Sequence, residues 1–276
     1  MARQKSLSFG IFLLVAVQSW CTRGEAPSPQ ANVQAPHIVG HRGLMMHAPE
    51  NTIAGFKACI ALGLGFELDV RKTSDGKLVC VHDDKLDRTT SGKGNVADFS
   101  FGDLRKLDAG AWFDPAFAGQ RVPLLDEVLA LLKGHGGILV ALDIKVPDVE
   151  EEVVRIVEKH GVERQVVCIG LAITEKAVRR KLRKASAKIP IAVLAQKADD
   201  VPAALKDSSS DWIYIRFVPT AAEATHIHKA GKRVILVGPL VAGKEAENWR
   251  RARSAGVDAV LTDYPLECRQ TWKKAP

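Results

Sequence analysis

Short apolar runs alternate with amphipathic helical segments from residue 37 almost to the end of the chain. Extended runs that alternate with helical patterns are typical of parallel strands joined by crossover helices. The pattern predicts strands at 37–41, 65–71, 78–82, 137–144, 165–169, 190–194, 211–216, 233–237 and 258–262. Helices are predicted at 52–63, 123–133, 148–160, 174–186, 199–206, 220–230 and 244–255. The repeat indicates an α/β protein.

Nine strands are one more than an eight-stranded barrel needs, and the second and third are separated by only a few residues. Asp75 and Gly76 lie between them, and Asp-Gly between two extended runs favours a hairpin. A turn centred on these two residues places Asp69 opposite His82. The remaining eight strands predict a TIM (β/α)8 barrel.

Residues 83–122 lack a convincing crossover helix and contain Gly, Asp and aromatic residues, among them Trp112 and Phe113. This stretch is interpreted as a cap inserted over the mouth of the barrel. No linker divides the rest of the chain, so 37–276 is predicted to be one domain.

The first 36 residues differ from the rest in composition. Arg3 and Lys5 precede an apolar run that is too short to cross a bilayer, which needs about 20 residues. Residues 1–26 are predicted to be a signal peptide and 27–36 a Pro-rich linker. We therefore expect an exported chain, periplasmic or secreted, without a stable membrane anchor.

Composition and charge exclude some classes of protein. With 46% apolar residues the chain is not disordered. The formal charge is +7, and removal of 1–26 leaves about +5 because three cations and one anion are lost. No basic run with interleaved aromatic residues is present, so nucleic acid is not an expected partner. Export permits disulfides, but no cysteine spacing resembles a metal site, and buried free thiols are at least as well supported.

Two carboxylates stand two positions apart on a predicted strand, Glu67 and Asp69, so they point to the same face. Carboxylates aimed at one point repel each other unless a cation or a proton joins them. Asp143, at the end of a later strand, offers a third. Oxygen ligands of this kind suit Ca²⁺ or Mg²⁺, and the sequence predicts a site for one such ion.

His41 is predicted to end the first strand and His82 the third, so both would project into the same mouth, at the face where active sites of barrels collect. Imidazoles titrate near neutral pH, so the pair can act as general acid and general base. Arg42 and Lys145 would supply positive charge to phosphate oxygens. The other histidines from 47 onward lie in loops or helices without such company.

Pro49-Glu50-Asn51-Thr52 precedes the first predicted helix. Asn51 or Thr52 can cap that helix. Glu50 is not needed for capping, and it is a candidate either to hold Arg42 in place or to join the metal ligands. The sequence leaves both roles open.

Together these motifs resemble the glycerophosphodiester phosphodiesterases. The resemblance is dense before residue 146, thin after it, and covers almost the whole chain beyond the predicted signal peptide. It is carried by His41-Arg42-Gly43, Pro49-Glu50-Asn51-Thr52, Glu67-Leu68-Asp69-Val70, Thr73-Ser74-Asp75-Gly76, Val81-His82-Asp83, Arg88-Thr89-Thr90, Gly92-Lys93-Gly94, Leu107-Asp108-Ala109-Gly110, residues 122–128, Asp143-Ile144-Lys145 and Leu261-Thr262-Asp263-Tyr264-Pro265.

The resemblance implies a TIM-barrel enzyme that uses one divalent metal to split small glycerophosphodiesters into glycerol 3-phosphate and an alcohol. It implies the following roles: His41 and His82 as acid and base, Glu67 and Asp69 as metal ligands, and Arg42 and Lys145 as phosphate contacts. We add Asp143 as a third predicted metal ligand, and Glu50 and Trp112 as further predicted substrate contacts. Which histidine is the acid is not implied.

Two departures from the family pattern stand out. Residue 143 is Asp where the family usually has Glu, which shortens the side chain by about 1.5 Å. Related barrels of the sphingomyelinase D type also use Asp there. Residues 234–238 replace the strand end Trp-Thr-x-Asn that the family tends to carry, so the identity of the alcohol is open.

Two alternative functions follow from the same features. One is a phospholipase D-like activity on lysolipids or sphingolipids, with aromatic residues of the cap facing the lipid. The other is a barrel that only binds phosphorylated ligands. The two histidines beside the carboxylates argue against the second, because a binding protein does not need proton-transfer groups.

Overall fold

Eight parallel strands form the central sheet in the computed structural model, and a ninth extends it as a hairpin arm. The structure describes Met1 and residues 35–274, so predicted segment 1–26 and most of 27–36 fall outside the described part. The strands are β1 His37–Gly40, β2 Gly65–Lys72, β3 Leu78–Cys80, β4 Val140–Ile144, β5 Val166–Ile169, β6 Ala192–Ala195, β7 Trp212–Ile215, β8 Arg233–Leu236 and β9 Ala259–Thr262. All nine predicted strands are confirmed, each within a few residues of its expected bounds.

The strands are arranged in the order β5-β4-β2-β1-β9-β8-β7-β6, so the first strand pairs with the last. The two ends of this order are joined by a single bridge between Cys168 and Ile191, which nearly closes the barrel. All neighbours in the order pair in parallel, as expected for a (β/α)8 barrel. The predicted fold class is confirmed.

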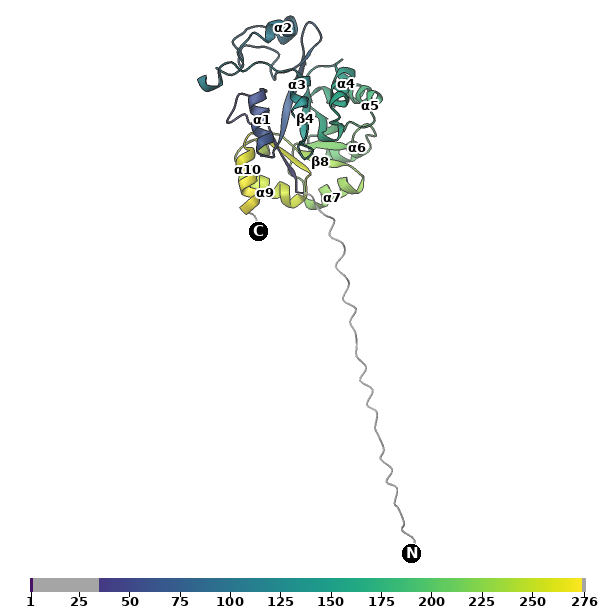
Figure 1. Cartoon of the computed structure of the whole chain (residues 1–276). Coiled ribbons are helices and arrows are strands. Elements are labelled where there is room, and N and C mark those ends of the chain that lie inside the picture. The colour runs from purple at the N-terminus through teal and green to yellow at the C-terminus, as the bar shows by residue number, and fades with distance from the viewer. Residues whose placement is uncertain (2–34, 275–276) are drawn as a thin grey trace. The chain divides into compact units, whose positions relative to one another are not determined.

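Helices surround the sheet (Figure 1). They are α1 Ile53–Ala61, α3 Leu125–Ala130, α4 Glu150–His160, α5 Lys176–Ala185, α6 Val201–Leu205, α7 Ala221–Lys229, α9 Ala246–Ala255 and α10 Pro265–Lys274, with short helices α2 Phe101–Leu104 and α8 Pro239–Ala242. Every predicted helix is present. α10 was not predicted, although Pro265 at its first position is a common start signal.

The hairpin between β2 and β3 has a different register from the predicted one. Val70 pairs with Cys80, and the backbone N–H of Val81 donates to the carbonyl of Asp69 (3.1 Å). Asp69 therefore lies opposite Val81 rather than His82, and the prediction was wrong by one residue. The cause is a three-residue loop that ends in Gly76 at φ +78°, where the prediction assumed a two-residue turn.

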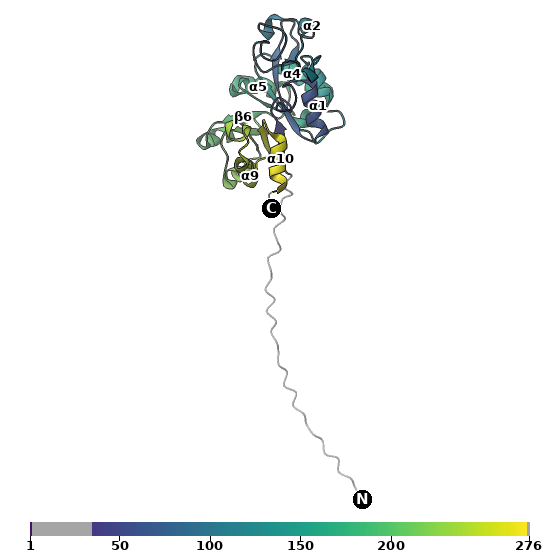
Figure 2. The same cartoon turned by 90° about the vertical axis from the view of Figure 1, so that its left-hand side faces the viewer.

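Residues 83–122 form the predicted cap segment. It contains α2 and has a small apolar core of its own, made by Leu86, Val96, Leu104, Ala109 and Val122 with Val79 and Val81 of the hairpin arm. In two perpendicular views the cap lies at one end of the folded unit, and α9 and α10 lie toward the other (Figures 1 and 2). The hairpin arm thus connects the sheet to the cap.

The main core fills the space inside the barrel and between strands and helices. β2 is buried over its first six residues, and Phe56 of α1 stacks on Phe66 at 4.8 Å between ring centroids. Cys59, Cys80, Cys168 and Cys268 are buried and free, in keeping with the free-thiol interpretation. Among the described residues, no helix is long and apolar enough to cross a membrane.

Candidate active site

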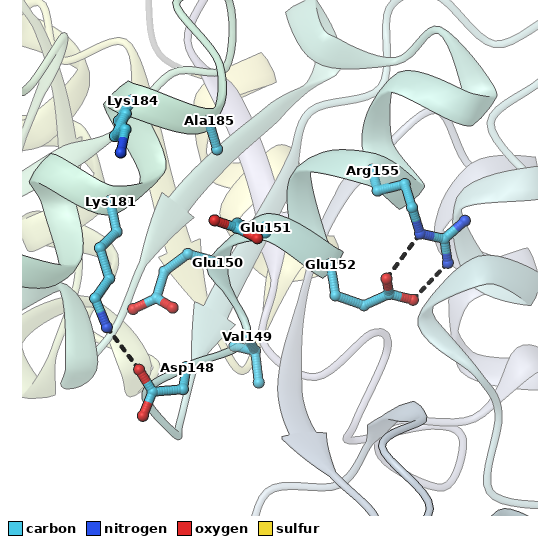
Figure 3. Close-up of a pocket in the computed structure, with 9 residues that line it drawn as sticks. All are labelled: Asp148, Val149, Glu150, Glu151, Glu152, Arg155, Lys181, Lys184 and Ala185. Atoms are coloured by element: carbon cyan, nitrogen blue, oxygen red, sulfur yellow. Dashed lines mark hydrogen bonds and ion pairs between the residues drawn. The ribbon is translucent and has the colours of Figure 1, made fainter.

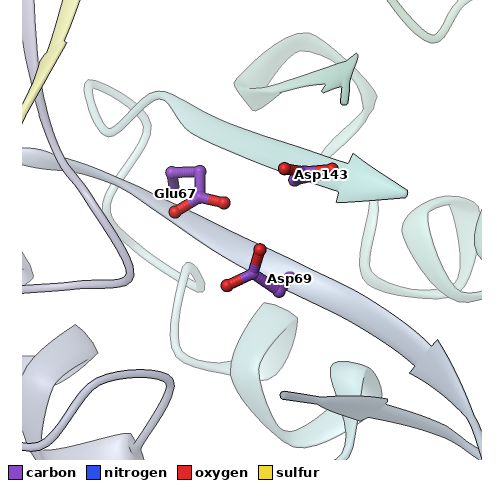
Figure 4. Close-up of side chains that lie close together, drawn as sticks. All are labelled: Glu67, Asp69 and Asp143. Atoms are coloured by element: carbon purple, nitrogen blue, oxygen red, sulfur yellow. The ribbon is translucent and has the colours of Figure 1, made fainter. Parts of the chain in front are cut away.

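Three carboxylates converge at the carboxyl end of β2 and β4 (Figure 4). Glu67 and Asp69 point to one face of β2, and Asp143 of β4 is the direct cross-strand partner of Asp69. One oxygen from each lies within 4.8 Å of the others. Asp143 therefore reaches the cluster despite its shorter side chain.

Three carboxylates so close together repel each other, and a nearby positive charge would stabilise their ionised forms. Burial raises the pKa of Glu67 well above its usual range, and the negative charges of Asp69 and Asp143 raise it further. Burial also raises the pKa of Asp143. Asp143 Oδ1 is buried and has no hydrogen-bond partner within residues 35–274. These oxygens fit a divalent cation, which would satisfy this atom and offset the repulsion.

Lys145 partly neutralises the cluster from one side. Its Nζ lies 2.6 Å from Asp143 Oδ2 and 2.9 Å from Asp69 Oδ1. Burial works against the ionised form of Asp69, but the charge of Lys145 and its hydrogen bond outweigh burial and lower the pKa of Asp69. One lysine among three carboxylates still leaves the cluster acidic.

Gly170, which follows β5, explains why no side chain covers Asp143 from that side. A Cβ at residue 170 would lie only 1.8 Å from Asp143 Oδ1. Glycine is thus required by the close approach of the backbone to the carboxylate.

The loop between β1 and α1 holds the acidic cluster from the opposite side. The backbone N–H of Arg42 donates to Glu67 Oε2 (2.7 Å). Asn51 makes two hydrogen bonds with Asp69, to the carboxylate (2.6 Å) and from the backbone N–H (3.1 Å). Thr52, not Asn51, caps α1. Arg42 and Asn51 have φ of +52° and +54°, a conformation that few non-glycine residues adopt and that is often found at functional sites.

His41 is oriented by a residue from the far end of the sequence. Its Nδ1 lies 2.7 Å from Asp263 Oδ1, on the residue that follows β9. Because a carboxylate only accepts, Nδ1 carries the proton and Nε2 is left toward the site. Nε2 lies 4.0 Å from Glu67 Oε2, so His41 borders the acidic cluster.

His82 is oriented in the same way by its neighbour in the chain. Its Nδ1 lies 2.7 Å from Asp83 Oδ1. Arg88 holds Asp83 with two hydrogen bonds of 2.8 and 3.0 Å, and these bonds lower the pKa of Asp83. Val81, the residue before His82, lies opposite Asp69 in the hairpin, so His82 is beside the same cluster.

Glu50 joins the two histidine sides through a pair of arginines. It accepts from Arg42 (2.9 Å) and twice from Arg88 (2.7 and 2.8 Å). Burial disfavours its ionised form, but the two arginines lower its pKa. Of the two roles left open by the sequence, Glu50 takes the first, holding Arg42, and it is not a member of the carboxylate cluster.

The remaining predicted contact, Trp112, lies on the cap. Its side chain is 40% exposed, and its indole N–H donates to the carbonyl of Ala109 (3.0 Å). It packs edge-on against Phe113. Away from the mouth, His160 and His228 pair with aspartates of their own surroundings.

A separate groove lies between the beginning of α4 and α5, with a volume of ≈ 770 Å³ (Figure 3). Two ion pairs lie among its lining residues, Lys181 with Asp148 and Arg155 with Glu152. Neither histidine of the mouth and no member of the acidic cluster lines it. It is therefore not part of the candidate active site.

Sequence reasoning assigned no role to several residues that complete the site. Asp263 belongs to a quoted motif, but nothing in the sequence indicated that it would meet His41 across 222 positions. Arg88 lies in a stretch without helical or strand periodicity. A carboxylate directly after a strand-end histidine, as in His82-Asp83, was the available signal for an orienting partner.

Comparison with known sequences shows that most of the chain matches a single protein family. The sequence model of the glycerophosphoryl diester phosphodiesterase family matches residues 41–267. A glycerophosphodiester phosphodiesterase of Caldanaerobacter subterraneus subsp. tengcongensis is 34% identical over 238 residues, 83% of this chain and 94% of the relative.

Solved structures with the same fold agree with this. A glycerophosphodiester phosphodiesterase from Agrobacterium tumefaciens is 28% identical, with a TM-score of 0.74 over 85% of this chain and 99% of the other. An Oleispira antarctica phosphodiesterase, solved with the product sn-glycerol-3-phosphate, has a TM-score of 0.73 at 23% identity over 87% of this chain and 98% of the other, which supports the fold alone.

Proposed function

We propose that this chain, which belongs to the glycerophosphoryl diester phosphodiesterase family, works by acid–base catalysis beside a bound divalent cation. The chain is a phosphodiester hydrolase, and it splits glycerophosphodiesters into glycerol 3-phosphate and an alcohol. The observation that carries the proposed mechanism is the position of three converging carboxylates at a mouth bordered by two aspartate-oriented histidines.

Glu67, Asp69 and Asp143 would hold the cation, Ca²⁺ or Mg²⁺, because all three offer carboxylate oxygens. When bound, the cation would offset the negative charge that develops on the phosphate oxygens. Arg42 and Lys145 add fixed positive charge at the same place, and each is already held by a carboxylate. Little reorganisation is therefore needed as charge builds up on the phosphate.

His41 and His82 would move the protons. Each keeps its Nδ1 proton on an aspartate, so Nε2 is the atom that accepts or donates. One imidazole takes the proton of the attacking O–H group as that oxygen bonds to phosphorus. The other imidazole gives a proton to the oxygen of the leaving alcohol as the bond between this oxygen and phosphorus breaks. The aspartates stabilise whichever ring is positively charged.

Binding of the cation is tested by calorimetric titration of Ca²⁺ and Mg²⁺ into chelator-treated protein. Hydrolysis of glycerophosphocholine is measured with the same samples. We expect Asp143→Asn to weaken cation binding more than about tenfold. Asp199→Asn is a matched control, because Asp199 is an exposed aspartate whose only ion pair within residues 35–274 is with Lys197. Full activity and no heat of binding after chelation would contradict the proposal.

We also propose that the chain is exported. The support is the sequence pattern of residues 1–26, with basic residues before an apolar run. Expression of the full chain, followed by fractionation and sequencing of its amino terminus, tests the proposal. A chain that keeps residue 1 and stays in the cytoplasmic fraction contradicts it.

A further inference from the structure

Most cations at the mouth of the barrel are already bound to the protein. Arg42 binds Glu50, Lys145 binds two aspartates, and Arg88 binds Asp83 and Glu50. Arg71 gives two hydrogen bonds to the carbonyl of His82. All four lie on the side of the mouth built by β1, β2, β4 and the cap.

Arg216 differs from these four. It directly follows β7, at the end of the strand where active sites of barrels are found, and it is exposed. Its backbone N–H bonds the carbonyl of Ala195, but within residues 35–274 its side chain forms no ion pair or hydrogen bond. Its charge is free for a ligand.

Gly238, after β8, provides the surface on which Arg216 lies. A Cβ at residue 238 would be 3.0 Å from Arg216 Nε, and the backbone there has φ of +102°. A larger residue would be strained and would push the guanidinium away. The glycine thus leaves Arg216 as the polar group on this part of the wall.

Tyr214, two positions before Arg216 on β7, supports this placement. It is half-buried, and burial together with the negative charge of Asp143 raises the pKa of its phenol to about 12, while the positive charge of Arg216 acts in the opposite direction. Because the barrel strands are parallel, Arg216 directly after β7 and Lys145 directly after β4 lie at the same end of the barrel.

The carboxylate cluster lies on β2 and β4, and Arg216 lies at the end of β7 without a carboxylate partner among residues 35–274. From this geometry we infer that Arg216 is part of a subsite for the alcohol part of the substrate and favours alcohols with their own negative charge, such as a second phosphate. The inference rests on the proposed function, because the subsite serves the same hydrolytic centre.

The test uses two substrates that differ only in one phosphate, glycerophosphoinositol and glycerophosphoinositol 4-phosphate. We expect wild-type kcat/KM to be at least about tenfold higher for the phosphorylated substrate at low ionic strength, as one charge-assisted contact allows. Arg216→Gln is expected to reduce this ratio about tenfold. Added salt should reduce the wild-type ratio, because Arg216 is exposed.

Arg233→Gln is the matched control. Arg233 is an exposed arginine at the start of β8, on the opposite end of the strands, where it lies over Trp212. The Arg233→Gln variant loses the same net charge as Arg216→Gln, and it should leave the kcat/KM ratio of the two substrates unchanged. Three outcomes would overturn the subsite alone. They are a wild-type kcat/KM ratio near one, a ratio for Arg216→Gln equal to that of the wild type, and equal reductions of the ratio in Arg216→Gln and Arg233→Gln. Hydrolysis of neither substrate, nor of glycerophosphocholine, would overturn the proposed function and the subsite with it.

Discussion

The two histidines of the mouth have the same immediate partner but different support. His41 pairs with Asp263, which follows the last barrel strand and contacts no cation within the described residues. His82 pairs with Asp83, which is in turn held by Arg88 of the cap. One histidine is therefore oriented by the barrel alone, and the other by an ion-pair chain that runs into the inserted segment. The difference predicts that changes in the cap act on His82 and not on His41.

The largest effects are expected from removing the imidazoles. His41→Ala and His82→Ala should each lower kcat by about 10²–10⁴-fold, the usual contribution of a general acid or base. His226→Ala, on the exposed face of α7, should have no effect. Steady-state rates with glycerophosphocholine measure this. Near wild-type activity in either histidine variant would show that this ring does not transfer a proton.

Substitution of the two orienting aspartates, Asp263 and Asp83, should affect the two histidines to different degrees. Asp263→Asn removes the full negative charge beside His41, whereas the charge of Asp83 is already shared with Arg88. We expect kcat to fall about 100-fold in Asp263→Asn and about tenfold in Asp83→Asn. The kcat and KM of both variants are measured separately, under the same conditions. The reverse order would mean that the cap-linked histidine depends more on its aspartate.

The contribution of the cap is tested with two arginines that cross from the cap to the barrel. Arg88 holds Asp83 and Glu50, while Arg105 pairs with Glu127 of α3, away from the histidines. Arg88→Gln should lower kcat about tenfold, and Arg105→Gln less than twofold. The acid limb of the Arg88→Gln pH–rate profile should move to higher pH, because the pKa of Asp83 is no longer lowered by the guanidinium. Equal losses in both variants would indicate general loosening of the cap.

The smallest expected effect is on stability. Arg88 lowers the pKa of Asp83 and of Glu50, so its stabilising effect is present above the ordinary carboxyl pKa of about 4 and is lost as pH falls through the lowered values. Arg88→Gln should reduce the free energy of unfolding by about 1 kcal/mol at pH 7, a small value because the side chain is partly exposed. The difference between variant and wild type should shrink at pH 3. Urea denaturation at both pH values measures it, and a constant difference would contradict the assignment.

The barrel and the acidic cluster could be predicted from the sequence because both depend on short repeats. Buried strands appear as apolar runs, and alternation on β2 places Glu67 and Asp69 on one face. The hairpin register was missed because a three-residue loop and a two-residue turn share the same Asp-Gly signal. A shift of one residue moves every side chain to the opposite face, so the local signal was not enough.

Contacts between distant segments were not predictable for a different reason. The sequence offered Asn51 only as one of two candidate helix caps, because its hydrogen bonds to Asp69 depend on the fold of the β1–α1 loop. The pairing of His41 with Asp263 requires the first and last strands to be neighbours. Nothing in either segment alone contains that information.

The pairing of β1 with β9 also sets the order in which the molecule is completed during synthesis. Nearly all the proposed catalytic residues leave the ribosome within the first 145 positions, but β1 waits for β9 before its second edge is paired. Until then His41 has no Asp263, and the barrel keeps an open edge that invites contact with other chains. A nascent chain stalled after β8 would therefore hold a nearly complete set of site residues without its final orienting contact, and the edge of β1 would stay open until β9 can pair with it.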